Sequence, residues 1–463
     1  MARIAVVGAG PAGLACALTI SEYNKEHHLE VFELGRRQRA RLCPVDRGLP
    51  CQGCNGVCNV ISGIGGSIHY GDSIKISGYP SGRRLFQHLG KQKYWELQAQ
   101  ALEFFGLEEK KLVLGTVNEF HGRHLRQYPI AELSELRTSE VIDRVEARVG
   151  KANNMIRHRC LVDALSKRSD GAFDVTYRRG MSTHVSTFDS VVLATGRAGF
   201  SSTTSLLHSL GIHGSMPSIS LGIRLELPST LLMPLYQAHV DFKFSEQHSG
   251  FKVKSFCFSN RADVGGRLKF CHYQKQFGRE VIFLDGHSNV TDGGQYEKIL
   301  DSGNFALMAQ LPAEFGRGWL NDQFVEKYFE ISGGKPIFQT LHSFLDSEGS
   351  PEIVPVPSVK DCREHSIAQL LPKDVTTALQ SAVSAVVESI ACSNNLSPNI
   401  VVQQGLVLAP EVEFFWPVID VSKSFETQCD LLYIVGDAVG IAQGNLQAAI
   451  TGIAAADNIL EVL

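Results

Sequence analysis

Four cysteines lie within sixteen residues of one loop-like stretch, CPVDRGLPCQGCNGVC, and they are Cys43, Cys51, Cys54 and Cys58. Four thiolates this close together are enough for a tetrahedral zinc site or an iron–sulfur cluster. A pair such as Cys54 and Cys58 can instead pass electrons as a dithiol, or supply a catalytic nucleophile if its pKa is lowered. The third interpretation is that the cysteines pack as small apolar side chains. The spacing favours a metal site and leaves the other two interpretations open.

Two further polar side chains, His69 and Asp72, follow a run of three glycines at Gly63, Gly65 and Gly66. Glycines allow a backbone to approach a phosphate or a ring where a side chain would leave no room. If this run lies against a cofactor, His69 and Asp72 meet the substrate and can act as a catalytic acid–base pair. A purely structural role for the histidine is the alternative.

The N-terminal segment RIAVVGAGPAGLACALTI has the pattern of a dinucleotide-binding turn. Residues 3–7 predict a buried strand, residues 14–20 predict a helix, and Gly8, Gly10 and Gly13 form G-x-G-x-x-G between them. The first glycine allows the tight turn, the second lets the backbone approach a pyrophosphate, and the third lets the helix pack on the strand. The helix N-terminus then presents free N–H groups to the phosphates.

The next predicted strand and the far end of the chain extend this pattern. The strand LEVFEL ends in Glu33, whose carboxylate is placed to accept hydrogen bonds from an adenosine ribose. Residues 431–435 predict another buried strand, followed by Gly436-Asp437 and a helix from about Asn445. This end resembles the C-terminal signature of FAD enzymes with the glutathione-reductase-type fold. The resemblance implies that the aspartate holds the ribityl chain and that the helix dipole stabilises the reduced flavin.

A third segment, FDSVVLATGRAG at 188–199, resembles the Ala-Thr-Gly strand end of the same fold, so three separated segments predict one FAD site. The residues expected to contact FAD are Gly8, Gly10, Pro11, Ala12, Gly13, Glu33, Gly65, Gly66, Ser67, Thr195, Gly196, Gly436, Asp437, Asn445, Leu446 and Gln447. No second strand–glycine–helix unit is visible. NAD(P)H is therefore expected only as a transient electron donor, which disfavours a disulfide reductase.

The sequence predicts an α/β protein with a Rossmann-like FAD-binding domain of the glutathione-reductase type and an inserted α+β substrate or cap domain. The FAD domain is expected to be discontinuous, over residues 1–80, 140–202 and 400–463. Residues 81–139 predict a helical insertion, and residues 203–399 the cap domain.

Several weaker candidates lie outside these motifs. Residues 157–165 predict a helix on the adenosine side of the cofactor. Arg224 could bind an anionic substrate, although an exposed strand arginine is the preferred interpretation. Cys257 and Cys271 are expected in the cores of strands, and Trp416 in the core or along the pocket.

Several motifs together resemble a bacterial family described only as uncharacterised FAD-dependent dehydrogenases. They are CPVDRGLPCQGCNGVCNVISGIGG, GDSIKIS, EFFG, SFCFS, GNFAL and GDAVGIAQGNLQAAITG. Members of that family continue the glycine run into Asp-Gly-Lys, whereas this chain keeps Asp72 and moves the lysine to Lys75. The resemblance implies the fold and FAD, and it supplies no established substrate.

Composition limits the partners. The net charge is −4 with no block of basic residues, so nucleic acid is not expected as a partner. The apolar N-terminus is interrupted by glycines, unlike a signal peptide, and no other segment approaches a membrane span. A cytoplasmic location is therefore expected, where the eleven cysteines remain thiols.

The expected reaction is hydride transfer at flavin N5 to or from a small organic substrate. Electrons would leave to oxygen, an electron-carrier protein or a nicotinamide, with zinc or an iron–sulfur cluster as the metal alternatives at the cysteines. The alternatives to this dehydrogenase are a flavin monooxygenase and an electron-transfer or redox-sensing protein. The sequence does not indicate the oligomeric state.

Overall fold

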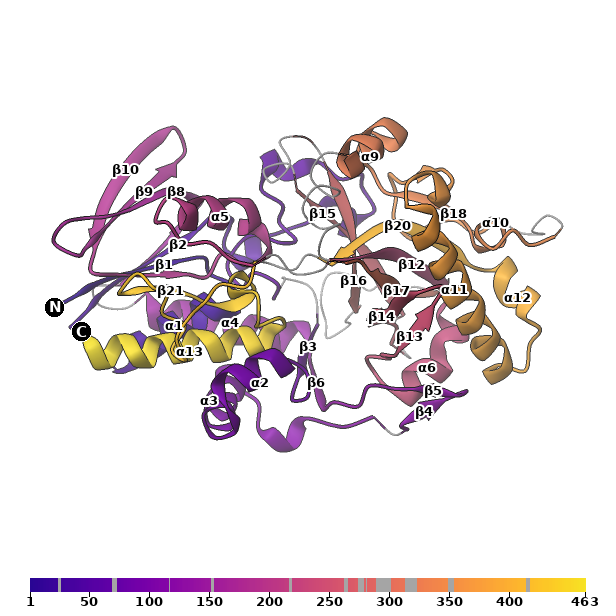
Figure 1. Cartoon of the computed structure of the whole chain (residues 1–463), viewed down its shortest axis with the longest axis horizontal. Helices are drawn as coiled ribbons and strands as arrows, with labels where there is room; N and C mark the ends of the chain where they lie inside the picture. Colours follow the sequence, from indigo (N-terminus) through magenta and orange to yellow (C-terminus); the bar gives the residue numbers. More distant parts are fainter. Residues whose placement is uncertain are drawn as a thin grey trace.

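The computed structural model of the protein describes every residue of 1–463 except 24–25, 69–72, 116, 151–153, 216–218, 262–264, 274–278, 280, 289–300, 313–322, 349–353 and 414–416. Figure 1 shows two lobes. The first lobe, on the left, contains both chain ends, and the second lobe, on the right, is built around a large antiparallel sheet.

The first lobe is built on a parallel five-stranded sheet with the order β21-β11-β1-β2-β7. The strands are β1 (Arg3–Val7), β2 (His28–Glu33), β7 (Met155–His158), β11 (Ser190–Leu193) and β21 (Leu432–Ile434). The central strands are almost completely buried runs of apolar residues, as parallel strands covered on both faces must be. The strands predicted at 3–7 and 431–435 are confirmed, and distant parts of the chain supply neighbouring strands.

Two helices made largely of small residues lie side by side along this sheet. They are α1 (Pro11–Tyr23) and α13 (Asn445–Val462), and α4 (Glu135–Val149) also packs on α1. The two helices approach closely at Gly452, which has no side chain. A Cβ at this position would overlap the carbonyl oxygen of Ala12. The helices predicted at 14–20 and from 445 are confirmed.

A three-stranded antiparallel sheet extends the first lobe. Its strands are β8 (Cys160–Lys167), β9 (Phe173–Arg179) and β10 (Ser182–Phe188), and α5 (Phe200–His208) packs on β8. The helix predicted at 157–165 is therefore wrong, because this stretch ends β7 and begins β8. Its buried side chains, Cys160 and Val162, alternate with exposed ones until a bulge after Val162 shifts the pattern, and this is a strand period rather than a helical one.

The second lobe contains a seven-stranded sheet with the order β13-β14-β17-β12-β20-β18-β19. Its strands are β12 (Ser220–Pro228), β13 (Ser245–His248), β14 (Phe251–Ser259), β17 (Ser302–Gln310), β18 (Ile337–Thr340), β19 (Arg363–Glu364) and β20 (Leu406–Glu413). Because β20 lies in the middle of this sheet, the chain returns to the first lobe after residue 413 and not at the predicted boundary of 400.

Helices and a hairpin cover the large sheet. The hairpin pairs β15 (Gly266–His272) with β16 (Ile282–Ser288), and the helices are α6 (Met233–Ala238), α9 (Phe324–Ser332), α10 (Leu341–Phe344), α11 (Lys373–Ser393) and α12 (Pro398–Gln403). Within the described residues, α11 is the one helix long and apolar enough to cross a membrane. It packs against β14 and β17 with 61% of its most apolar window buried, as a core helix does.

The segment predicted as a helical insertion at 81–139 is only partly helical. It begins with α2 (Arg83–Leu89) and α3 (Lys91–Phe104) and continues through the short strands β4 (Glu119–Phe120) and β5 (Arg123–His124). It ends in β6 (Ile130–Leu133), which pairs with β3 (Ile74–Ser77). The two-stranded sheet of β3 and β6 lies between the two lobes (Figure 1).

Candidate functional site

The turn from β1 into α1 needs two of its three glycines for its own geometry. Gly8 has a φ of +108°, and a Cβ there would overlap the carbonyl oxygen of Ala194. A Cβ on Gly13 would overlap the carbonyl oxygen of Gly8. Gly10 differs, because a Cβ there would meet only the Cα of Gly66, at an ordinary 3.8 Å. The fold therefore tolerates a side chain at Gly10, and its absence leaves space in front of the turn.

The carboxylate of Glu33, at the end of β2, holds three chain segments together. Oε2 accepts a hydrogen bond from the amide of Ala9 (2.8 Å), and Oε1 accepts from the amides of Gly35 (2.7 Å) and Gly63 (2.8 Å). The residue is 5% exposed. Its position at the strand end is as predicted. Its bonds to the backbone, in place of a ribose, were not foreseen.

The guanidinium of Arg41 organises the glycine run from the other side. This fully buried side chain donates hydrogen bonds to five backbone carbonyls. The acceptors belong to Asn59, Val60, Ile64, Gly66 and Ile68. Sequence reasoning missed Arg41, since nothing local distinguishes it from the exposed arginines around it.

The glycine run packs directly on the first turn. The amide of Gly65 donates to the carbonyl of Ala9 (2.8 Å), and a Cβ on Gly66 would lie 2.8 Å from the Cα of Gly10. The amides of Gly10 and Ser67 donate to no residue that the structure describes. Two adjacent loops thus present unused N–H groups, an arrangement that suits an anion. We call the loops 8–13 and 63–67, with Asp437 and the start of α13, the cradle.

The C-terminal part of the cradle touches both loops. A Cβ on Gly436 would lie 3.0 Å from the Cβ of Ala12, and the Ser67 hydroxyl donates to Oδ1 of Asn445 (2.7 Å). Asn445 begins α13, whose first-turn amides are unpaired within the helix. Four of the predicted cofactor segments therefore meet.

Asp437 is the one polar side chain of the cradle without a bonding partner among the described residues. It is partly buried in a 3-10 turn, Gly436–Val439. Burial raises the pKa of its carboxyl to about 6, and the nearby Arg197 opposes that rise. A half-buried carboxylate that accepts no hydrogen bond is well suited to accept one from a ligand hydroxyl.

Two of the predicted contact residues have side chains that serve the fold instead. Leu446 is fully buried in the core of the first lobe. Gln447 is 1% exposed and donates to the carbonyls of Ser77 (2.9 Å) and Ser81 (3.3 Å), which ties α13 to the β3–α2 segment. The predicted contact of these two residues with FAD is therefore expected through their backbone amides, and it remains a prediction.

The Ala-Thr-Gly end of β11 closes the cradle and reaches toward the second lobe. Gly196 has a φ of +52°, and the hydroxyls of Thr195 and Thr203 hydrogen-bond to each other. The next residue, Arg197, forms an ion pair with Asp285 of β16, with 2.6 Å between Nη1 and Oδ2. A residue beside the cradle is thereby tied to the second lobe.

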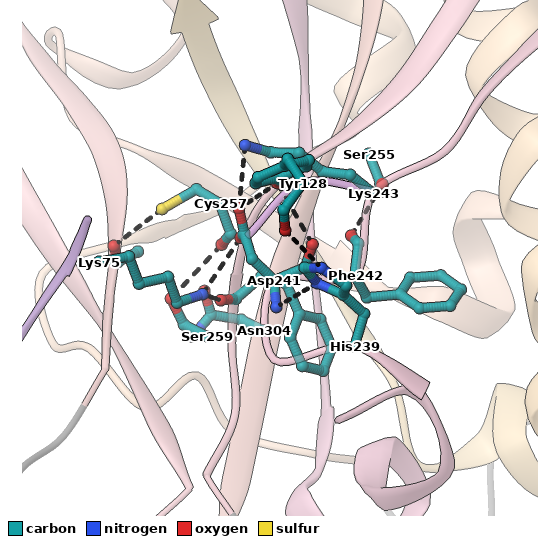
Figure 2. A network of polar contacts seen from close by, with 12 residues as sticks. Lys75, Tyr128, His239, Asp241, Phe242, Lys243, Ser255, Cys257, Ser259 and Asn304 are labelled. Atoms are coloured by element: carbon teal, nitrogen blue, oxygen red, sulfur yellow. Dashed lines mark hydrogen bonds and ion pairs between the residues drawn. The ribbon is translucent and has the colours of Figure 1, made fainter. Parts of the chain in front are cut away.

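A second link between the lobes is the network in Figure 2, centred on Asp241. Its carboxylate lies 3.1 Å from Nζ of Lys75 and 2.9 Å from Nζ of Lys243, and it accepts a hydrogen bond from the Tyr128 hydroxyl (2.6 Å). Lys75 comes from β3 and also donates to the carbonyl of Phe258 in β14. The lysine that departs from the family motif is thus an interlobe anchor.

Protonation in this network follows from its burial. Burial tends to raise the pKa of Asp241, but Lys243, Lys75 and the Tyr128 hydroxyl outweigh burial and hold that pKa well below its ordinary value. Burial, followed by the charge of Asp241, raises the pKa of Tyr128. Burial lowers the pKa of His239, whose Nδ1 accepts a hydrogen bond from the backbone amide of Asp241 (3.0 Å). Asp241 is therefore ionised at neutral pH while Tyr128 and His239 are neutral.

The four clustered cysteines are all free thiols, two of them buried (Cys43 and Cys58) and two partly exposed (Cys51 and Cys54). In the described ranges, no group of three or more His, Cys, Asp or Glu residues is arranged to hold a metal ion. Burial raises the pKa of Cys43 to about 12 and that of Cys51 to about 11, so both thiols are protonated at neutral pH. The predicted four-cysteine metal site is therefore not supported.

The physical reason is that the cysteine loop packs against the second lobe. Cys43 and Cys58 belong to the apolar core of that lobe, and the Cys58 thiol contacts the carbonyl of Phe270 in β15 (3.8 Å). Asp46, between the cysteines, pairs with the fully buried Lys269 (3.2 Å). Cys43 and Cys58 are thus packed as apolar groups. A redox role for the pair Cys54 and Cys58 remains a prediction.

Other candidates have mixed outcomes. Arg224 is not exposed as expected but fully buried, with Nε 2.8 Å from Oε2 of Glu411, and burial raises the pKa of that glutamate to about 7. Cys271 lies in the core of β15 as predicted, whereas Cys257 is partly exposed. The catalytic candidates His69 and Asp72, together with Trp416, lie outside the described residues.

No protein-family model matches this sequence, and no curated protein matches it. Among solved structures, CtdE in complex with FAD and a substrate gives a TM-score of 0.38 at 10% identity, over 98% of this chain and 78% of that one. The flavin-dependent halogenase CmlS gives 0.40 at 12%, over 98% and 56%. Aklavinone-11 hydroxylase with FAD and aklavinone gives 0.43 at 11%, over 100% and 62%. These TM-scores are too low to support an argument about function.

Replacing Asp241 by Asn should destabilise the protein, because two partly buried lysines lose their buried counter-charge. We expect the free energy of unfolding at pH 7, measured by urea titration, to fall by about 3–5 kcal/mol. Since the folded pKa of Asp241 lies below the unfolded value of about 3.9, its contribution is present above that pH and is lost as the pH falls further. The difference in the free energy of unfolding between variant and wild type should therefore become smaller below about pH 4.

The exposed pair of Arg39 and Asp143 provides the control for this experiment. Asp143→Asn should leave the midpoint of urea unfolding nearly unchanged, both at pH 7 and below about pH 4. An Asp241→Asn protein as stable as the wild type at pH 7 would contradict the assigned role of the network.

Proposed function

We propose that this protein is an FAD-dependent oxidoreductase that exchanges a hydride with a small organic substrate. The observation that carries the proposal is the cradle, where two glycine loops with unused amides, an unpartnered carboxylate and a helix N-terminus meet at the edge of a parallel sheet. A dinucleotide needs each of these groups, since its pyrophosphate is anionic and its sugar chains carry hydroxyls.

The chemistry of the described residues fits FAD bound at the cradle. The amides of Gly10 and Ser67 and the N-terminus of α1 are suited to the pyrophosphate, and the β2 end at Glu33 to the adenosine side. Asp437 is suited to accept a hydrogen bond from a ribityl hydroxyl. The N-terminus of α13 is suited to the flavin ring, where its dipole favours negative charge.

Bound FAD would supply two-electron chemistry at its N5 atom. The protein's contribution is to fix the lobes around the ring. Arg197 ties the end of β11 to Asp285, and Lys75 ties strand β3 to Asp241. Both pairs link the lobes and would hold their relative geometry, which orientation-dependent hydride transfer requires.

The partner reactions remain part of the proposal. We retain a dehydrogenase that passes electrons to oxygen, a carrier protein or a nicotinamide, with NAD(P)H as a transient donor. The alternative is a flavin monooxygenase. The similar structures reported above include a hydroxylase and a halogenase, names of the kind that this alternative would have. An electron-transfer or redox-sensing protein is the third option.

Anaerobic reduction of the flavin distinguishes these options. We expect the purified protein to retain or take up FAD with a visible flavin spectrum. Bleaching by an organic donor without NAD(P)H indicates the dehydrogenase, whereas bleaching by NAD(P)H and oxygen insertion on aeration indicate the monooxygenase. Reduction by dithionite or by a reduced carrier protein, but by neither an organic donor nor NAD(P)H, indicates the electron-transfer role. Protein that takes up no FAD on reconstitution contradicts the proposal as a whole.

Replacing Gly10 by Ala tests the cradle without disturbing the fold. The added Cβ meets only the Cα of Gly66 at 3.8 Å, so we expect unfolding of the apoprotein to change by less than about 0.5 kcal/mol. The same Cβ occupies the space intended for the pyrophosphate. FAD affinity, measured by fluorescence titration, should fall about tenfold or more. Gly13→Ala is the contrast, because it should impair folding itself. Unchanged FAD binding in Gly10→Ala would contradict the site.

Asp437→Asn should separate stability from cofactor binding. Because the pKa of Asp437 is raised to about 6 in the folded protein, its ionisation costs stability above that pH. The apoprotein of the variant should be about 1–2 kcal/mol more stable at pH 8, and the gain should disappear below about pH 4. FAD affinity should fall about tenfold. A variant that is less stable at pH 8 and binds FAD normally would contradict this role.

A further inference from the structure

A cavity of about 880 Å³ lies between the 105–115 segment, the β6–α4 region at 130–144 and the end of α6 at 236–240. It shares no lining residue with the cradle. Its volume is within the range of small-molecule binding sites, and three separate chain segments form its walls. Neither the proposed FAD site nor the interlobe ion pairs account for it.

The walls of the cavity are largely apolar and its rim exposes large apolar side chains. The apolar wall residues are Phe105, Leu107, Ile130, Leu133, Val141 and Tyr236. At the rim, Val113 and Leu114 are 66% and 59% exposed. Neighbouring exposed aliphatic residues cost solvation free energy, and they are typical of the entrance to a site for an apolar molecule.

The charges around the cavity leave two cations unpaired. Among the residues that the structure describes, neither Lys111 nor Arg144 takes part in an ion pair. Of the described acidic residues that line the cavity, Glu132 alone also takes part in no ion pair. The other acids that line the cavity are Glu108 and Glu140, and each pairs with a neighbouring cation. The cavity thus has a net unpaired positive charge.

The guanidinium of Arg144 is held in a fixed position in the cavity wall. One of its terminal nitrogens donates to the carbonyls of Phe104 and Glu103, the latter at 3.4 Å, which fixes the guanidinium in place. Both of these bonds come from Nη2, and among the described residues the other terminal nitrogen, Nη1, has no hydrogen-bond partner. Arg144 lines the cavity. A fixed guanidinium with an unused N–H in a cavity wall suits an anionic oxygen, which is the strongest acceptor.

From this geometry we infer that the cavity binds a small apolar molecule with one anionic group. Arg144 binds the anion, and the apolar walls bury the hydrocarbon part. The rim at Val113 and Leu114 is the entrance. This site is independent of the proposed FAD site, so each can fail without the other.

Isothermal titration of the full-length protein with octanoate and with 1-octanol, with and without added FAD, tests the inference. Octanoate should bind with a stoichiometry of one, and more tightly than 1-octanol. Arg144→Gln should weaken octanoate about tenfold and leave 1-octanol unchanged, since only the carboxylate uses the guanidinium. Ala238→Phe fills the cavity and should weaken both ligands. Arg178→Gln, an exposed strand residue of the first lobe, is the matched control and should bind octanoate like the wild type.

The far-UV spectrum and a cooperative thermal unfolding transition of each variant establish that it is folded. No saturable binding of octanoate to the wild type overturns the inference. Binding that neither Arg144→Gln nor Ala238→Phe weakens overturns it as well, because the ligand then lies elsewhere. Equal affinity for octanoate and 1-octanol, unchanged in Arg144→Gln, overturns the anionic part.

Discussion

The carboxylate of Glu33 is the constraint on which the cradle depends. One buried anion accepts amides from the β1–α1 turn, from the end of β2 and from the glycine run, three segments that share no other common partner. Arg41 complements it by collecting carbonyls from the same glycine run. Glu33 accepts hydrogen bonds from backbone amides and Arg41 donates to backbone carbonyls, so together they fix the glycine run from both sides. The amides of Gly10 and Ser67 are left facing outward as a consequence.

The sequence predicted correctly those features that depend on residues close together along the chain. The strand at 3–7, the glycine turn and the helix from 445 follow from side-chain periodicity and from backbone conformations that only glycine adopts freely. Asp437 was identified through the resemblance of its segment to the C-terminal signature of FAD enzymes. The helix predicted at 157–165 failed because a two-residue period was read as a helical one.

Interactions between distant residues were beyond the sequence. Arg41 and Arg224 look like surface residues in a linear chain, and only the fold shows that both are completely buried among acceptors. The cysteine cluster misled for the same reason, since its spacing suits a metal site but its loop is drawn onto the core of the second lobe. Short spacing along a chain does not ensure convergence in space.

The packing of α13 on α1 has a consequence for how the protein is made. A side chain at Gly452 would collide with the first turn of α1, so the N-terminal motif and the last helix fit together as one unit. The ribosome synthesises them more than four hundred residues apart. The nascent N-terminal strand and helix must therefore wait, with their apolar surfaces unmatched, until β21 and α13 have left the exit tunnel. Chaperones that bind exposed apolar helices have their longest opportunity on this chain in that interval.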